Sequence, residues 1–144
     1  MQMKIIAQNK KAYFEYEILE KFEAGIQLRG DEIKTIRANK ATLVGSYAKI
    51  LISGREPEVY WVGGNLADTT EPQRTRKLLM HRSEINKLIG KTREKGLTLI
   101  ATKLYLKAGK AKLEIALCKG KKLHDKREAL KKKDLQREQQ RQKF

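Results

Sequence analysis

The sequence FEYEILEKFEAGIQL, residues 14–28, carries the clearest structural pattern in the chain. Its even positions are mostly apolar, and charged or polar residues occupy most of the positions between them. Alternation with a period of two predicts a β-strand with one face in a core, so we expect Phe14, Tyr16 and Phe22 to point inward. Glu20 interrupts the apolar face and Gly25 follows it. We therefore expect the strand to bend or bulge, as strands do where a sheet curls into a small barrel.

Downstream of this strand, the pattern predicts a short helix and then a hairpin. Residues 31–37 combine an N-cap residue, an acidic first turn and a basic end, which is typical of a helix. Residues 47–52 and 58–62 are rich in β-branched and aromatic side chains, and a turn sequence separates them. Residues 63–73 are polar and predict a surface loop.

The second half of the chain predicts helix and then another hairpin. Residues 75–95 carry apolar positions at helical spacing, with a break expected near His81. Residues 97–107 and 111–118 alternate as strands around a turn. The predicted fold class is mainly β: a closed or nearly closed antiparallel barrel of the oligonucleotide-binding type, with a few helices.

The charge of the chain predicts a polyanionic partner. Lys and Arg number 33 against 17 Asp and Glu, which gives a formal charge of +16 on 144 residues. Nucleic acid is the favoured partner; a membrane is not expected, because no run of about 18 apolar residues is present. A single cysteine, Cys118, and the lack of a signal-peptide pattern predict a protein of the reducing cytoplasm.

The composition changes after Gly120, which divides the chain into a domain, 1–120, and a tail, 121–144. The tail is crowded with Lys and Arg and has few large aliphatic residues, so it is expected to be disordered when free. Helix-favouring residues dominate after Asp125, so a helix is expected once a partner neutralises the charge.

The sequence offers little for catalysis, and no enzyme activity, cofactor or metal is predicted. Phosphate-binding, dinucleotide-binding and zinc spacings are all missing from the sequence. Glu15 and Glu17 are interpreted as the solvated side of a strand rather than a catalytic pair. His81 fits an RNA contact or a helix end better than a general base. Cys118 falls at an outward strand position with lysines nearby, but without a His base it is interpreted as structural.

The basic residues suggest where RNA would bind. Arg74, Arg76 and Lys77 lie so close in sequence that they are expected to repel one another unless a phosphate sits between them. Asn9-Lys10-Lys11 is followed closely by the aromatic Tyr13. Cations interleaved with aromatic rings suit phosphate pairing combined with base or sugar stacking.

Several motifs in order resemble one known family. These are NKKA from Asn9, FEAGI from Phe22, L-x-G-x-EIK from Leu28 with Arg37 beyond it, SY at Ser46-Tyr47, RTRKLL from Arg74, and GKK-x-HDKR from Gly120. The chain resembles the SsrA-binding protein family, also called small protein B, over essentially its whole length.

The resemblance implies a barrel that grips the tRNA-like domain of transfer-messenger RNA. It also implies a tail that enters the decoding site of the small ribosomal subunit and becomes helical there. The function that it implies is the rescue of stalled ribosomes by trans-translation. Elongation factor Tu with GTP would deliver the RNA.

The resemblance also implies residue roles. The expected RNA contacts are Asn9, Lys10, Lys11, Glu23, Lys34, Arg37, Ser46, Tyr47, Arg74, Arg76, Lys77, Leu79 and His81. The expected ribosome-binding tail residues are Gly120, Lys121, Lys122, His124, Asp125, Lys126 and Arg127. Glu23 is expected to accept hydrogen bonds from base amino groups or ribose hydroxyls, or else to form an internal salt bridge.

The sequence departs from the family pattern at Gly45, Asp31, Thr35 and Leu123, and its 63–73 loop is short, so we assign no contacts to that loop. Two other functions stay open at this point. One is a ribosomal or general oligonucleotide-binding protein with the same barrel, and the other, ranked below it, is a nuclease.

Overall fold

Strand β2 (Glu17–Ile26) pairs with a strand on each side in the computed structural model, which describes residues 3–52, 54, 56–94 and 96–120. Phe22 and Ala24 are buried in the core, as the alternation predicts. The antiparallel register of β2 with β9 (Lys110–Lys119) shifts between Ile18 and Glu20. The expected irregularity near Glu20 is thus confirmed.

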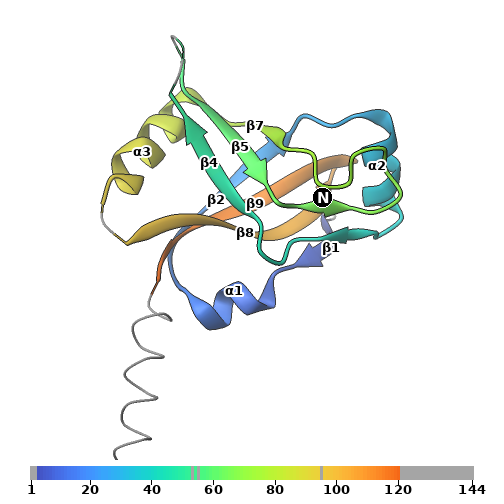
Figure 1. Cartoon of the computed structure of the whole chain (residues 1–144), viewed down its shortest axis with the longest axis horizontal. Coiled ribbons are helices and arrows are strands. Elements are labelled where there is room, and N and C mark those ends of the chain that lie inside the picture. The colour runs from blue at the N-terminus through green and yellow to red at the C-terminus, as the bar shows by residue number, and fades with distance from the viewer. Residues whose placement is uncertain (1–2, 53, 55, 95, 121–144) are drawn as a thin grey trace, which may run out of the picture.

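Six strands close into a barrel, which confirms the predicted fold class (Figure 1). Their order is β8-β4-β5-β7-β2-β9, and pairing of β8 with β9 closes the ring. The strands not yet bounded are β4 (Tyr47–Leu51), β5 (Glu58–Val62), β7 (Arg76–Leu79) and β8 (Leu97–Lys107). Both predicted hairpins, β4–β5 and β8–β9, are confirmed.

The N-terminal part differs from the expectation. Strand β1 (Met3–Gln8) pairs with β8, and residues 14–15 belong to helix α1 (Lys10–Glu15) rather than to the long strand. Helix α1 begins at Asn9, whose side chain accepts a hydrogen bond from the backbone N–H of Ala12, as an N-cap does. Phe14 is consequently 65% exposed, and the prediction that it points inward is wrong.

The region expected to be helical from residue 75 begins instead with strand β7. Arg76 and Leu78 are buried while Lys77 and Leu79 point the other way, so this four-residue segment has strand periodicity. Four residues are too few for the sequence to distinguish that period from a helical one. Helix α3 (Arg82–Thr92) starts just after His81, where the break is expected, and buries Ile85 and Leu88.

Two smaller features complete the arrangement. Helix α2 (Gly30–Arg37) is found where it is predicted, and Figure 1 shows it on the opposite side of the barrel from α3. The segment expected to be a loop contains a short strand, β6 (Asn65–Leu66), paired with β3 (Ala41–Thr42). Among the described residues, none of the helices has the length and apolar character that crossing a bilayer requires.

The core contains one place where only glycine fits. Trp61 is fully buried, and a Cβ added to Gly64 would lie 2.0 Å from its ring. Such contacts do not occur between real side chains, so Gly64 allows the backbone to close over the indole. On β9, Cys118 alternates with the core residues Ile115 and Leu117, as expected for an outward position, yet it is fully buried by the rest of the protein. Desolvation raises the pKa of its thiol to about 11, which agrees with a structural role.

Candidate RNA interface

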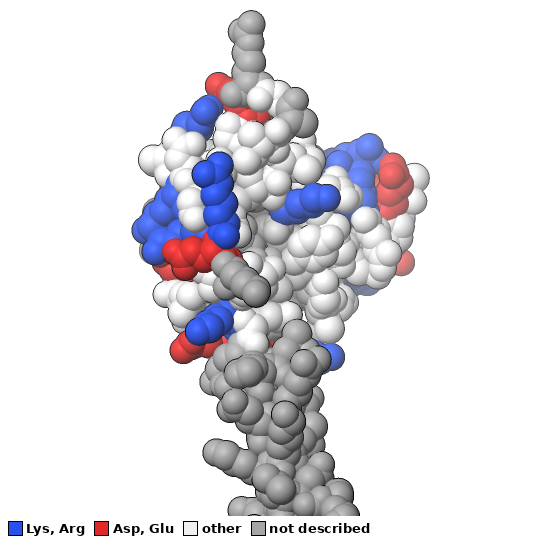
Figure 2. All heavy atoms as spheres, turned by 60° about the vertical axis from the view of Figure 1, so that its left-hand side comes forward, with Lys and Arg blue, Asp and Glu red and all other residues white. Residues whose placement is uncertain are grey.

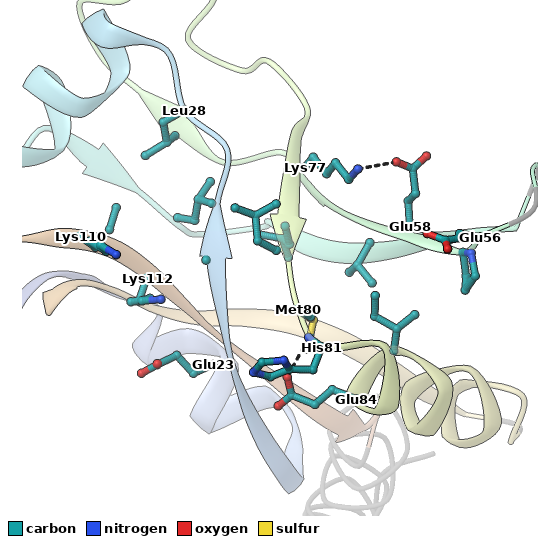
Figure 3. A pocket seen from close by; sticks show the side chains of 18 of the residues that line it. Glu23, Leu28, Glu56, Glu58, Lys77, Met80, His81, Glu84, Lys110 and Lys112 are labelled. Atoms are coloured by element: carbon teal, nitrogen blue, oxygen red, sulfur yellow. Dashed lines mark hydrogen bonds and ion pairs between the residues drawn. The ribbon is translucent and has the colours of Figure 1, made fainter.

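Four of the predicted RNA contacts line one groove of about 1030 Å³, here named the main groove (Figure 3). Glu23 comes from β2, Lys77 and Leu79 come from β7, and His81 lies where β7 leads into α3. The irregular barrel therefore gathers on one surface residues up to 58 positions apart in the sequence.

Glu23 is a partly exposed carboxylate at the edge of the main groove, with 40% of its side chain accessible. Its Oε2 accepts a hydrogen bond from the Tyr105 hydroxyl and lies 3.5 Å from Lys107 Nζ. The hydrogen bond from Tyr105, followed by the charges of Lys107 and Lys112, lowers the pKa of Glu23 in spite of partial burial. The group is held in the ionised form, which can only accept hydrogen bonds.

Lys77 also has an acidic partner. Its Nζ lies 2.7 Å from Glu58 Oε2, and the hydroxyl of Tyr60 donates to Glu58 Oε1 at 3.1 Å (Figure 3). The hydrogen bond with Glu58 raises the pKa of Lys77, and the same bond lowers the pKa of Glu58. Lys77 is thus a charged group whose position over the groove is constrained.

Leu79 and His81 give the groove an apolar and an aromatic surface. Leu79 is 53% exposed, because it alternates with the buried Leu78 along β7. The backbone N–H of His81 donates to Glu84 Oε1 at 3.2 Å, so the carboxylate caps α3 while the exposed imidazole points from the helix start (Figure 3).

Arg74 and Arg76 point inward, toward a buried carboxylate on α2. Glu32 accepts from Arg74 Nη2 at 2.6 Å, from Arg76 Nε at 2.7 Å and from the backbone N–H of Arg29 at 2.8 Å. Burial raises the pKa of Glu32, but the hydrogen bonds from Arg74, Arg29 and Arg76 outweigh that effect and hold it at about 2. We name Glu32, Arg74 and Arg76 the buried ion cluster.

This arrangement corrects the premise that Arg74, Arg76 and Lys77 need a phosphate to coexist, because Glu32 and Glu58 lie between them. Arg76 has no exposed surface. Its guanidinium also donates to the carbonyl oxygens of Gly64 and Pro72, and it stacks 5.4 Å from the ring of Trp61. Its donors are directed into the protein.

A second groove, of about 410 Å³, gathers four more of the predicted residues: Asn9, Lys11, Ser46 and Tyr47. Asn9 is buried and donates to the Ala101 carbonyl at 3.2 Å, and Ser46 is buried and donates to the Leu43 carbonyl at 2.6 Å. Both polar side chains are therefore engaged in hydrogen bonds to backbone carbonyls of the protein itself. Lys11 and Tyr47 are exposed and remain accessible to a partner.

The other predicted residues lie apart from both grooves. Lys10 is exposed at the start of α1, and Lys34 and Arg37 are exposed on α2. Gly120 ends the described part, where its N–H donates to the Gly96 carbonyl at 3.3 Å. The predicted tail positions Lys121, Lys122, His124, Asp125, Lys126 and Arg127 lie outside the described residues.

The structure adds basic residues that the sequence reasoning missed. Lys110 and Lys112 line the main groove from the start of β9, and Lys107 lies beside Glu23. The hairpin was predicted, but its packing against β2 was not, so these lysines could not be connected with Glu23. Figure 2 shows Lys and Arg in separate groups on one face, with uncharged surface between them.

Among the described ranges, no group of three or more His, Cys, Asp or Glu side chains is arranged to hold a metal ion. The main groove offers lysines for phosphates, carboxylates that can accept hydrogen bonds, and exposed apolar surface. These are the elements of single-strand or loop recognition in RNA.

A family model described as SmpB protein matches residues 6–143. The chain belongs to the SmpB family. An SsrA-binding protein from Nostoc sp. is 51% identical, with 96% of this chain and 92% of that protein covered. An SsrA-binding protein from Syntrophobacter fumaroxidans is also 51% identical, with 94% of this chain and 86% of that protein covered.

The fold of this chain is similar to that of a chain in a solved structure described as "tmRNA-SmpB: a journey to the center of the bacterial ribosome". A chain of that structure is 40% identical and has a TM-score of 0.65, covering 80% of this chain and 83% of that one.

Proposed function

We propose that this protein binds the tRNA-like domain of transfer-messenger RNA through the main groove and enables rescue of stalled ribosomes by trans-translation. One observation carries the proposal. Glu23, Lys77, Leu79 and His81, expected from the resemblance to contact RNA, converge on one groove that Lys110 and Lys112 also line. Membership in the SmpB family and similarity to a chain solved with tmRNA on the bacterial ribosome support the same partners.

The residues of the main groove divide the work of recognition. Lys77, Lys110 and Lys112 pair with phosphates, which supplies affinity that depends on salt. Glu23 cannot bind phosphate, but it accepts from base amino groups or ribose hydroxyls and so discriminates between RNAs. The exposed side chains of Leu79 and His81 provide surfaces on which an unstacked base can pack.

The buried ion cluster has a supporting role in this proposal. Arg76 joins α2 to β7 and so fixes the strand that carries Lys77 and Leu79. The exposed Lys11 and Tyr47 of the second groove, together with Lys10, Lys34 and Arg37, provide additional contacts to RNA outside the main groove.

The tail, residues 121–144, carries the ribosomal part of the proposal. Its lysines and arginines pair with ribosomal RNA near the decoding centre, and the helix preference after Asp125 is expressed there. Delivery of the RNA with elongation factor Tu and GTP belongs to the same proposal and rests on the resemblance to the family, and a cytoplasmic location fits the ribosome as partner.

RNA co-purification followed by sequencing tests the proposed partner. Transfer-messenger RNA should be enriched over ordinary tRNA and ribosomal RNA relative to their cellular amounts. Recovery of RNAs in proportion to their abundance would favour a general oligonucleotide-binding protein instead.

Removal of the tail tests whether RNA binding and ribosome rescue belong to separate parts of the chain. A chain that ends at Gly120 should keep its fold and most of its affinity for the tRNA-like domain, yet lose activity in a reconstituted rescue assay. The matched control keeps full length and charge but scrambles the order of residues 121–144. Full rescue by the scrambled chain would reduce the tail to a nonspecific cation.

A further inference from the structure

The outer face of the barrel carries two similar arrangements beside the main groove, each with a tyrosine, a glutamate and a lysine. In one, Tyr60 and Lys77 bind Glu58. In the other, Tyr105 and Lys107 bind Glu23. They differ in how the carboxylate is used. Glu58 accepts from Tyr60 on Oε1 and from Lys77 on Oε2, so both of its oxygens are engaged.

Glu23 is engaged on one side only. Tyr105 and Lys107 both reach Oε2, and within the described residues no hydrogen bond is made to Oε1. The carboxylate is 40% exposed and lines the main groove. One oxygen is therefore anchored by the protein, and the other is available to a donor in the groove.

The anchoring residue is built into the sheet. Tyr105 lies on β8, directly across from Lys112 of β9, and Lys112 in turn pairs with Gly25 of β2. Its neighbours Leu104 and Leu106 pack on the core, so the tyrosine lies on the outer face. It is nevertheless only 5% exposed. A ring held in this way has little rotamer freedom, and its hydroxyl reaches across β9 to β2 from a fixed point.

We propose that Tyr105 is a positioning residue, whose hydroxyl holds the Glu23 carboxylate so that Oε1 accepts a hydrogen bond from a base amino group or ribose hydroxyl of the bound RNA. The inference rests on the proposed function and adds the residue on which its specificity depends. The protonation states agree with it. Burial raises the pKa of Tyr105, so it remains a donor at neutral pH, and its hydrogen bond is the main cause of the lowered pKa of Glu23.

A titration of the free protein tests the anchoring step without RNA. The Tyr105→Phe variant removes one hydroxyl and keeps the ring. The Glu23 carboxyl, followed by ¹³C NMR, should titrate at a higher pH in this variant than in the wild-type protein. An unchanged titration would overturn the inference. In the matched control, Tyr60→Phe, the Glu23 titration should stay at its wild-type position.

A double-mutant cycle tests the consequence for recognition. Tyr105→Phe should weaken binding to the tRNA-like domain about fivefold, the loss expected for one hydrogen bond, with an unchanged slope of log affinity against log salt. In a Glu23→Ala background the same substitution should change affinity less than about twofold, because the group it orients is gone. Tyr60→Phe should instead have the same effect in both backgrounds.

The outcomes separate the two claims. If the wild-type protein binds the RNA and the losses from Tyr105→Phe and Glu23→Ala simply add, the inference is wrong while the proposed function stands. If the wild-type protein does not prefer the tRNA-like domain over ordinary tRNA, the proposed function fails and the inference fails with it. Loss of thermal stability that accounts for all of the lost binding would also contradict a positioning role.

Discussion

Glu32 and Glu23 are both carboxylates surrounded by cations in a strongly basic chain, yet they are used in opposite ways. The side chain of Glu32 is 2% exposed, and its oxygens are occupied by Arg74, Arg76 and a backbone N–H. The side chain of Glu23 is 40% exposed, and one oxygen is left open to the main groove. Burial decides between the two roles, because a carboxylate without water must be satisfied entirely by the protein.

The difference explains how a chain with a charge of +16 organises its cations. Arg74 and Arg76 are turned inward by Glu32: Arg76 holds α2 against β7 and has no exposed side-chain surface, and Arg74 keeps 21% of its side chain exposed. The lysines around Glu23 and Glu58 stay at the surface. A cation's position in the sequence therefore says little about RNA contact until its acidic partner is known.

The largest expected effect is on stability, from Glu32→Gln. Removing one partner of a buried ion pair leaves the other charge uncompensated, so the free energy of unfolding should fall by about 3 to 5 kcal/mol. Urea denaturation measures it. The matched control is Glu71→Gln, which breaks the exposed pair with Arg29 and should leave the unfolding midpoint nearly unchanged. Similar losses in the two variants would show that burial does not distinguish these pairs.

Acid should act through the same carboxylate. The pKa of Glu32 is about 2 in the folded protein against an ordinary value of 4.5, so folding favours its ionised form. Because the pKa is lower in the folded than in the unfolded protein, ionised Glu32 stabilises the fold above pH 4.5, and this stabilisation is lost as the pH falls toward 2. The stabilisation is about 3 kcal/mol. Between roughly pH 5 and pH 2, the wild-type protein should therefore lose more stability than Glu32→Gln. Parallel pH curves for the two proteins would contradict this assignment.

Much of the fold could be predicted because the decisive patterns are local. The alternation in β2, β8 and β9 and the charge pattern of α2 are each contained within about a dozen residues, and all four elements are present. Helix α1 was missed because the alternation continues back to Phe14 in the sequence, whereas the start of the helix is set by the Asn9 cap. Strand β7 was missed because its pairing partners on β2 and β5 determine it, and those contacts are distant in sequence.

The candidate site was predictable only in part. Motif resemblance selected Glu23, Lys77, Leu79 and His81, which the fold brings to one groove. It also selected Arg76, whose burial depends on Glu32, 44 positions away in the sequence. Local charge density could not reveal that partner. Nor could it reveal Tyr105, which acts on Glu23 across an intervening strand.

The smallest expected effects concern surface residues around Glu23. Lys112→Ala should reduce the slope of log affinity against log salt by about 0.7 to 0.9, because one phosphate contact is lost. Glu23→Gln should weaken binding about tenfold with the slope unchanged, because a hydrogen bond that favours the charged form is weakened without loss of a cation. Fluorescence titrations at several salt concentrations measure both. Lys4→Ala, on β1 and outside both grooves, is the control and should change neither quantity much.

An equilibrium competition between two RNAs shows whether the main groove recognises the tRNA-like domain specifically. The labelled tRNA-like domain of transfer-messenger RNA is bound to the full chain at moderate salt, and unlabelled ordinary tRNA is added as competitor, with the wild-type protein and Glu23→Gln compared side by side. The account predicts that ordinary tRNA competes poorly against the wild-type protein and clearly better against Glu23→Gln. Equal competition by ordinary tRNA for the wild-type protein would contradict specific recognition, because the main groove would then bind RNA through charge alone.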